Sequence, residues 1–191
     1  MPALIYLHGF NSSPESKKAL QTLRWFEQNA PEIECVCPWL PPFADKAMSL
    51  LEKLVRDRLP EPVFVIGSSM GGFFATCLIE QYKLKGVLVN PAVSPDRGLQ
   101  SWLGENANYQ TGEKWSFEPA HIDEYRRWDP VEIKNKNNYL VLLQSGDEVL
   151  DYRDAQQRYT GCKIILEPGG DHSFIDYHRH LENIHQFLVS A

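Results

Sequence analysis

The stretch VFVIGSSMGG, residues 63–72, passes abruptly from four apolar residues to a run of glycine, serine and methionine. Its apolar half predicts a buried strand, and the residues that follow it, FFATCLIEQY, predict a helix. Between the two, Gly67, Ser69 and Gly71 match the pattern Gly-x-Ser-x-Gly. A sharp turn from strand to helix strains its central residue and projects that side chain above the sheet, and the glycines let strand and helix approach closely. The stretch therefore predicts a turn that presents Ser69 at the start of a helix.

Five further apolar runs have the length and composition of buried parallel strands. Together with residues 63–66, they occupy residues 3–7, 33–37, 86–89, 139–143 and 163–166. Helical patterns such as ADKAMSLLEKLVRDRL fill most of the intervals. Because parallel strands need crossover connections, which are usually helical, this alternation predicts an α/β fold. We expect three layers: a mostly parallel sheet of about six strands with helices on both faces, and ligands bound beyond the carboxyl ends of the strands.

The first helix is expected within SSPESKKALQTLRWFEQNA, residues 12–30. Ser12 and Glu15 have the spacing of a capping box, in which each side chain satisfies a backbone N–H at the start of a helix. Pro14 suits the first helical turn. The pattern therefore predicts a helix that begins close to Ser12.

Length and charge restrict the class of protein. The chain has 191 residues and 43% hydrophobic content, which predicts that residues 1–191 form a single domain. Its net charge is −6 with scattered Lys and Arg, so nucleic acid is not an expected partner. No apolar run approaches the roughly 20 residues that cross a bilayer, and MPALIYLHGF lacks the features of a signal peptide. We expect a cytoplasmic protein without a membrane span and favour a monomer.

The four cysteines, Cys35, Cys37, Cys77 and Cys162, include no Cys-x-x-Cys pair. We expect reduced, structural thiols, because free cysteine usually behaves as a small buried hydrophobic residue.

One segment, residues 94–138, interrupts the alternation because it contains no convincing strand. It is too long for a routine connection and is expected to form an excursion with short helices of its own. Six aromatic residues crowd into it: Trp102, Tyr109, Trp115, Phe117, Tyr125 and Trp128. They either pack on the main core or form a small cap over an active site. We favour the cap, with Trp102, Trp115 and Trp128 as candidate substrate-pocket residues.

Two later strand ends supply the partners that a serine nucleophile requires, namely a base and an acid that orients it. YLVLLQSGDEVLDY runs from a strand to Asp147, and KIILEPGGDHSFIDY runs from the last strand to His172. The chain order serine, acid, histidine, each after a later strand, is the α/β-hydrolase arrangement. Asp147 is our choice for the acid. Glu148 and Asp151 lie nearby, although Asp151 better suits the cap of the following helix.

The loop after the first strand, YLHGFNSSP, is expected beside the nucleophile. Its Gly9 allows a backbone N–H to approach, and we assign the N–H groups of Phe10 and Met70 as the two donors of an oxyanion hole. His8 is expected to hold this loop rather than to transfer protons. His8 and Asn11 are further candidate pocket residues.

The other histidines do not form a metal-binding pattern. His121 lies in the excursion, and His178, His180 and His185 fall in the last helical pattern, where solvated or partly packed positions are expected. No His-Glu-x-x-His motif or cluster of Cys and His is present, so we predict neither a metal ion nor a cofactor.

Five stretches, in the same order from end to end, carry a family resemblance: YLHGFNSSPES, IGSSMGGFFAT, NPAVSP, SGDEVLDYRDA and GGDHSF. Through them the chain resembles the α/β-hydrolase superfamily, and within it the YqiA family of small bacterial esterases. The resemblance implies Ser69 as nucleophile, Asp147 as acid and His172 as base. It also implies hydrolysis of small carboxylic esters with short acyl groups, and acyl thioesters as further candidates. Met70 stands where leucine is more usual, a change that keeps the packing and the backbone donor.

The expected reaction is ester hydrolysis through an acyl-enzyme, without a cofactor. Four alternatives remain open. An acyltransferase, a peptidase or a cofactor-free lyase could use the same three residues, and a non-catalytic binding module could keep the fold alone.

Overall fold

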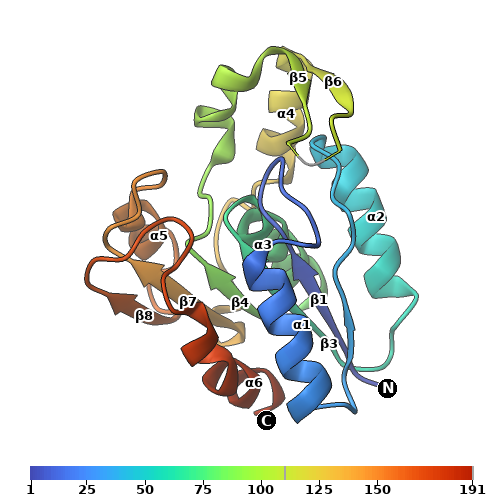
Figure 1. Ribbon diagram of the computed structural model, residues 1–191, viewed down its shortest axis with the longest axis vertical. Helices are drawn as coiled ribbons and strands as arrows, with labels where there is room; N and C mark the ends of the chain where they lie inside the picture. The colour runs from blue at the N-terminus through green and yellow to red at the C-terminus, as the bar shows by residue number, and fades with distance from the viewer. Residues whose placement is uncertain (110, 191) are drawn as a thin grey trace.

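The computed structural model describes residues 1–109 and 111–190, and its centre is a six-stranded, fully parallel sheet (Figure 1). The strand order is β2-β1-β3-β4-β7-β8. The strands are β1 (Ala3–Leu7), β2 (Glu34–Val36), β3 (Val63–Ser68), β4 (Lys85–Val89), β7 (Tyr139–Gln144) and β8 (Lys163–Glu167). Each lies where an apolar run predicts it, and the α/β fold is confirmed.

The register of the central strands brings their carboxyl ends together. β1 pairs with β3 from Ala3 opposite Val63 to Leu7 opposite Gly67. β3 pairs with β4 as far as Ser68 opposite Val89. The loops that follow β1, β3 and β4 therefore start at the same edge of the sheet, as the α/β fold predicts for a binding site.

Helices cover both faces of the sheet (Figure 1). One face carries α1 (Lys17–Asn29) and α6 (Leu181–Val189), which pack with the side chains of one apolar cluster. The opposite face carries α2 (Ala44–Arg56), α3 (Met70–Tyr82) and α5 (Tyr152–Arg158), which contribute to a second cluster. The chain thus forms the three layers that its sequence predicts.

On the first face, α6 buries a narrow apolar stripe. It consists of Leu181, Ile184 and Leu188, whose spacing places them on one side of a helix. In contrast, α3 buries ten consecutive residues from Met70 to Ile79, because it lies between the sheet and the surrounding helices. The start of α3, next to Ser69, is therefore buried on all sides.

The first helix begins later than predicted, at Lys17, and the predicted capping box at Ser12 and Glu15 is wrong. The residues before the helix form two turns, with hydrogen bonds from the Ser12 N–H to the Gly9 carbonyl and from the Ser16 N–H to the Ser13 carbonyl. The hydroxyl of the buried Ser13 accepts the Glu15 N–H at 3.1 Å. Serine side chains often satisfy local backbone groups in this way, in competition with a helix cap.

Residues 94–138 leave the sheet between β4 and β7 and extend beyond the strand ends, at the top of Figure 1. The described part contains η1 (Pro95–Arg97), η2 (Leu99–Trp102), β5 (Gly104–Ala107), β6 (Lys114–Phe117), α4 (Pro119–Trp128) and η3 (Lys136–Asn138). The expectation of no strand is wrong, because β5 and β6 pair as an antiparallel hairpin. The sequence of β5, GENA, lacks apolar alternation because three of its four residues are exposed.

Two other expectations concern thiols and membranes. All four cysteines are free. The buried Cys77 thiol donates to the carbonyl of Trp128 at 3.3 Å, which ties α3 to the end of α4. Among the residues that the structure describes, no helix is both long and apolar enough to cross a membrane.

Candidate active site

The turn between β3 and α3 holds Ser69 in a strained backbone conformation, with φ 56° and ψ −121°. Gly67 and Gly71 are required on either side of it. A Cβ atom on Gly67 would lie 2.1 Å from the carbonyl oxygen of Gly71, and one on Gly71 would lie 1.9 Å from that of Leu7. Only glycine lets the start of α3 approach β1 and β3 so closely. The turn therefore has the geometry of a nucleophile elbow.

The Ser69 hydroxyl is hydrogen-bonded to a histidine that is itself paired with a carboxylate. His172 Nε2 lies 3.0 Å from Ser69 Oγ. On the other side of the ring, His172 Nδ1 lies 2.8 Å from Asp147 Oδ2 and 3.0 Å from Asp147 Oδ1. Asp147 follows β7 and His172 follows β8, so three segments far apart in the sequence meet at one edge of the sheet.

Asp147 is held as a carboxylate in a nearly buried position. Its side chain is 2% exposed, and its Oδ1 accepts the N–H groups of Val149 and Leu150, each at 2.9 Å. Burial acts to raise the pKa of Asp147, but the hydrogen bonds from His172 and from the two backbone groups lower it below its usual value. An ionised Asp147 places the imidazole proton on Nδ1, which leaves Nε2 free to accept the Ser69 proton.

The two alternative acids have other roles. Glu148 Oε2 accepts the backbone N–H of His172 at 3.0 Å. Asp151 is the N-cap of α5 and accepts the Arg153 N–H, as predicted for it. Neither carboxylate bonds to the imidazole ring, so the geometry favours Asp147 as its partner.

The loop after β1 lies directly against the serine. A Cβ atom added to Gly9 would lie 3.5 Å from Ser69 Cβ and 3.8 Å from Ser69 Oγ. Within residues 1–109 and 111–190, neither the Phe10 N–H nor the Met70 N–H donates to a protein acceptor. The N–H of Met70, which follows Ser69, and the N–H of Phe10, which follows Gly9, are therefore both unpaired among these residues, which is one condition for the predicted oxyanion hole.

His8 is buried beneath this loop, with 1% of its surface exposed, and holds the loop by two hydrogen bonds. Its Nε2 accepts the Leu40 N–H at 3.0 Å, so Nδ1 donates to the Gly9 carbonyl at 2.9 Å. Burial lowers the pKa of His8, against the opposing effect of the Gly9 bond. A neutral imidazole with both nitrogens engaged fits the expected role of His8 in holding the loop.

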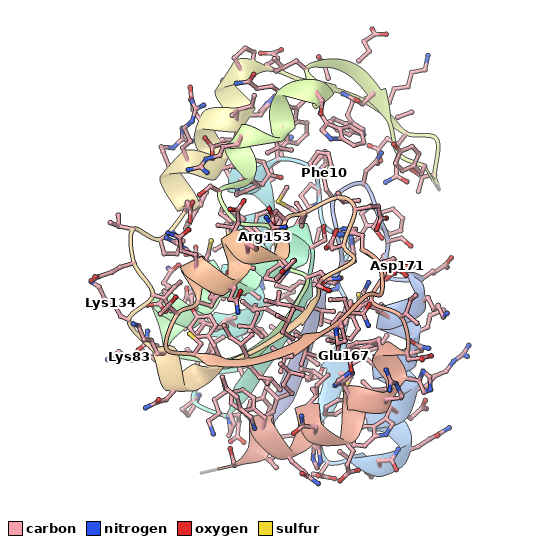
Figure 2. All side chains as sticks on the ribbon, turned by 90° about the vertical axis from the view of Figure 1, so that its left-hand side faces the viewer. Phe10, Lys83, Lys134, Arg153, Glu167 and Asp171 are labelled. Carbon is pink, nitrogen blue, oxygen red and sulfur yellow. The ribbon has the colours of Figure 1, made fainter. Side chains whose placement is uncertain are left out.

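Phe10 connects the same loop to the excursion. In Figure 2, Phe10 lies between the main body and the side chains of the excursion. Its ring centroid lies 5.0 Å from that of Trp102, 5.7 Å from that of Trp115 and 6.1 Å from that of Phe117. The edge-on geometry of these pairs is a favourable arrangement for aromatic rings.

A cavity of about 1250 Å³ opens at Ser69 and His172. Its walls come from the loop after β1, the start of α1, η1 and η2, the loop after β7, and residues 171–178. Of the predicted pocket residues, His8 and Trp102 line it.

Asn11, Trp115 and Trp128 do not line this cavity, contrary to their assignment as pocket residues. Asn11 Nδ2 donates to the Ala107 carbonyl at 3.1 Å and ties the loop to the hairpin. Trp115 packs beside Phe10. Trp128 Nε1 donates to Asp45 Oδ1 at 2.8 Å, which directs its ring towards α2.

Sequence reasoning missed two buried carboxamides that hold the histidine loop, which we define as residues 169–176. Asn90 follows β4 and is 3% exposed. Its Nδ2 donates to the carbonyls of Asp171 and His172 at 3.1 and 3.4 Å, and its Oδ1 accepts the Gln144 N–H at 3.0 Å. Asn90 therefore links the ends of β4 and β7 to the loop that carries the histidine.

Gln144 ends β7, is also 3% exposed, and contacts the same loop. Its Oε1 accepts the N–H groups of Asp171 and Ile175 at 3.3 and 2.8 Å, and its Nε2 donates to the Ile175 carbonyl and Glu167 Oε2, each at 2.9 Å. One signal was present in the sequence: YLVLLQ ends an otherwise apolar strand with glutamine. A buried polar group needs partners, so such a residue is a candidate for a structural role beside a site.

Within the described residues, no group of three or more His, Cys, Asp or Glu side chains is placed to hold a metal ion.

The sheet, the strained serine turn and the acid and histidine on later strand ends define the α/β-hydrolase fold, and solved structures of that fold match the chain almost throughout. Est1E from Butyrivibrio proteoclasticus, solved with ferulic acid bound, superimposes with a TM-score of 0.74 at 14% identity, over 99% of this chain and 88% of Est1E. The monoacylglycerol lipase from Paleococcus ferrophilus has a TM-score of 0.68 at 14% identity, over 97% of this chain and 94% of the lipase. Identities this low establish the fold alone.

The chain belongs to UPF0227, described as an uncharacterised protein family, whose sequence model matches residues 3–189. The UPF0227 protein of Serratia proteamaculans (strain 568) is 26% identical over 189 residues, which cover 96% of this chain and 97% of that protein.

Proposed function

We propose that this protein is a serine hydrolase that cleaves small carboxylic esters, with acyl thioesters as further substrates. One observation carries the proposal: His172 bridges the Ser69 hydroxyl and the Asp147 carboxylate, with distances of 3.0 and 2.8 Å. Without such a base, a serine hydroxyl is a weak nucleophile.

In the first half of the cycle, Ser69 Oγ attacks the ester carbonyl while His172 Nε2 takes its proton. The negative charge that develops on the carbonyl oxygen is stabilised by the N–H groups of Phe10 and Met70. Asp147 stabilises the imidazolium that forms. His172 then returns the proton to the leaving alcohol or thiol, and the acyl group stays bound to Ser69.

In the second half, a water molecule replaces the alcohol in the cavity. His172 takes a proton from this water as it attacks the acyl carbonyl, and the same two N–H groups stabilise the second oxyanion. Return of the proton to Ser69 Oγ releases the carboxylic acid. Every group in this cycle belongs to the chain itself, the substrate or water.

The excursion at residues 94–138 acts in this proposal as a cap on a single hydrolase domain. Its η1 and η2 contribute one wall of the cavity, including Leu99 and Trp102. Apolar side chains at this wall suit the acyl or alcohol part of an ester. The similarity in fold to Est1E, solved with ferulic acid, and to a monoacylglycerol lipase supports an acyl substrate.

The test compares the wild-type protein with Ser69→Ala and His172→Ala on p-nitrophenyl esters of graded chain length and on acyl-CoA thioesters. Each substitution is expected to lower turnover by about a million-fold, as for other serine triads, without unfolding the protein. Ser49→Ala, a serine exposed on α2, is the matched control and retains full activity. Retained turnover in either triad variant would remove that residue from the mechanism.

Labelling with a fluorophosphonate probe separates a missing substrate from a missing nucleophile. A wild-type protein that is labelled at Ser69 but hydrolyses no ester or thioester would have to use the triad for acyl transfer, peptide hydrolysis or a lyase reaction. Absence of labelling would indicate a binding protein.

A further inference from the structure

The first turn of α1 has an unusual distribution of charge. The amino end of a helix carries a partial positive charge, which normally favours acidic residues there and disfavours lysine. In this helix the first two residues are Lys17 and Lys18, and the first turn has no acidic residue. The N-cap, Ser16, makes no side-chain hydrogen bond to the helix. Positive charge thus accumulates at a helix end where the fold alone gives no reason for it.

This helix end faces the same cavity as Ser69. Ser16, Lys17, Lys18 and Gln21 all line the cavity. Lys18 Nζ donates to the Ser173 carbonyl at 2.7 Å, next to the histidine of the triad. The positive end of α1 is therefore part of the candidate substrate site.

Lys18 lacks a carboxylate partner. In the part of the chain that the structure describes, it forms no ion pair. Burial lowers the pKa of Lys18 to about 8, although the more distant Asp171 and Asp147 carboxylates act to raise it. An ammonium group removed from water without a counterion is a natural partner for an anion.

A buried hydroxyl lines the cavity as well. Tyr6 on β1 is 1% exposed, and its hydroxyl has no hydrogen-bond partner among the residues that the structure describes. Ser68 also lines the cavity and lies close enough to influence the phenol, but no hydrogen bond of normal geometry joins the two. Burial raises the pKa of Tyr6, so the phenol keeps its proton and remains a donor. Buried polar groups are rarely left without a partner, and an unpaired donor beside a cavity points to a bound acceptor.

In the part of the chain that the structure describes, none of the acidic residues that line the cavity forms an ion pair with Lys17 or Lys18; these residues are Glu148, Asp151, Asp154, Asp171 and Asp176. Glu148 and Asp151 already accept backbone N–H groups, from His172 and Arg153. Asp171, labelled in Figure 2 and part of the histidine loop, accepts the Ser173 hydroxyl.

We propose that the first turn of α1, Lys18 and Tyr6 form a subsite for an anionic oxygen group carried by the substrate, either a carboxylate or a phosphate. The subsite supplies only donors: the helical N–H groups that lack intrahelical partners, the ammonium group and the phenol. Because the subsite and Ser69 share one cavity, the inference rests on the proposed esterase function. It narrows the substrate class to esters with an anionic group on the acyl or the alcohol part.

The test compares esters that carry a free carboxylate with the corresponding methyl esters, and reads the change in their rate ratio between variants. Mono-p-nitrophenyl adipate carries a free carboxylate, and its methyl ester is the neutral match on the acyl side. A second pair, 4-carboxyphenyl butyrate and 4-(methoxycarbonyl)phenyl butyrate, places the carboxylate on the alcohol side. For at least one pair, the wild-type protein is expected to prefer the anionic ester by about tenfold or more in kcat/KM, the effect of one charge-assisted hydrogen bond.

Lys18→Met is expected to remove most of this preference, and Lys18→Arg to retain it. The ratio between the two esters is the informative quantity, because loss of the Lys18 bond to the Ser173 carbonyl would slow both esters equally. Tyr6→Phe is expected to lower the ratio without loss of thermal stability, because its hydroxyl has no protein partner. Lys134→Met is the control, because Lys134 does not line the cavity. Figure 2 shows Lys134 and Asp171 on opposite sides of the molecule. Equal rates on both esters of each pair, or an unchanged ratio in Lys18→Met, would overturn the proposal.

Binding measurements separate the subsite from the esterase function. Calorimetric titration of Ser69→Ala with adipate and with inorganic phosphate measures the binding of each anion in the absence of turnover. It shows which of the two anions the subsite binds. Binding that disappears in the Ser69→Ala, Lys18→Met double variant supports the subsite even if no ester is hydrolysed. Absence of binding by both anions, together with no ester preference, would refute it.

Discussion

Replacing Gln144 with methionine tests whether the histidine loop is positioned by hydrogen bonds. The substitution keeps the length of the side chain and removes both polar atoms. Four hydrogen bonds are lost, three to the backbone of Asp171 and Ile175 and one to Glu167 Oε2. At about 1 kcal/mol of net stability for each hydrogen bond, the free energy of unfolding is expected to fall by about 4 kcal/mol.

The same change is expected to slow catalysis, because His172 directly follows one of the residues that lose a bond. A misplacement of about 1 Å at a reacting group can lower the rate by about a hundredfold. We expect the loss in kcat, with KM for a neutral ester much less affected, since the cavity walls formed by α1 and η2 do not depend on Gln144.

Urea unfolding gives the change in stability, and p-nitrophenyl butyrate hydrolysis, under conditions where the variant is folded, gives the change in rate. Gln186→Met is the matched control, because Gln186 is exposed on α6 and, within the described residues, its side chain bonds only to Glu182 one turn away. Its free energy of unfolding should stay within about 0.5 kcal/mol of wild type. If Gln144→Met loses stability but keeps the wild-type kcat, the carboxamide does not position the histidine and the reasoning is refuted.

Three further predictions concern other parts of the structure. Gly71→Ala places a Cβ atom 1.9 Å from the Leu7 carbonyl oxygen, so the start of α3 must shift. Soluble variant protein should therefore lose most of its ester turnover, and an unchanged kcat would contradict this. The preference for anionic esters should decline as pH rises through about 8, where burial places the pKa of Lys18; a ratio constant from well below to well above that pH would exclude Lys18 as the charge that is sensed. Thr76→Val removes the partner of the buried Tyr159 hydroxyl and should lower the free energy of unfolding by about 1–3 kcal/mol, whereas adding Tyr159→Phe should recover part of that loss; an equal loss in both variants would assign the effect to packing.

The sheet was predictable because its strands are continuous apolar runs, and a parallel strand buried on both faces needs little else. The serine turn was predictable for a different reason. At Gly67 and Gly71 a Cβ atom would collide with backbone atoms, so the two glycines in the sequence pattern indicate a close approach of strand and helix. The placement of Asp147 and His172 followed from the rule that parallel strands end at one edge of the sheet.

Other features depend on contacts between distant residues and left little trace in the local sequence. β5 is largely exposed and is held by pairing with β6, so it lacks the alternation that marks a strand. Trp128 was expected at the pocket because it is aromatic, but the direction of its ring depends on Asp45, 83 residues earlier. Asn90 contacts the histidine loop 81 residues later in the sequence. The catalytic roles of the site residues stay predictions until the variants are measured.

Phe10 has a consequence for the way such a protein can diversify. Its backbone N–H is the proposed oxyanion donor, while its ring packs 5.0 Å from that of Trp102 in the excursion. If residues 94–138 were replaced by the corresponding segment of a relative to change substrate choice, the new segment would also have to pack against the Phe10 ring. If it did not, the donor would shift and the chemical step itself would slow. Recombination at residues 94–138 would therefore have to preserve the contacts of Phe10 with Trp102, Trp115 and Phe117, together with the bonds that join Asn11 and Asp45 to the excursion.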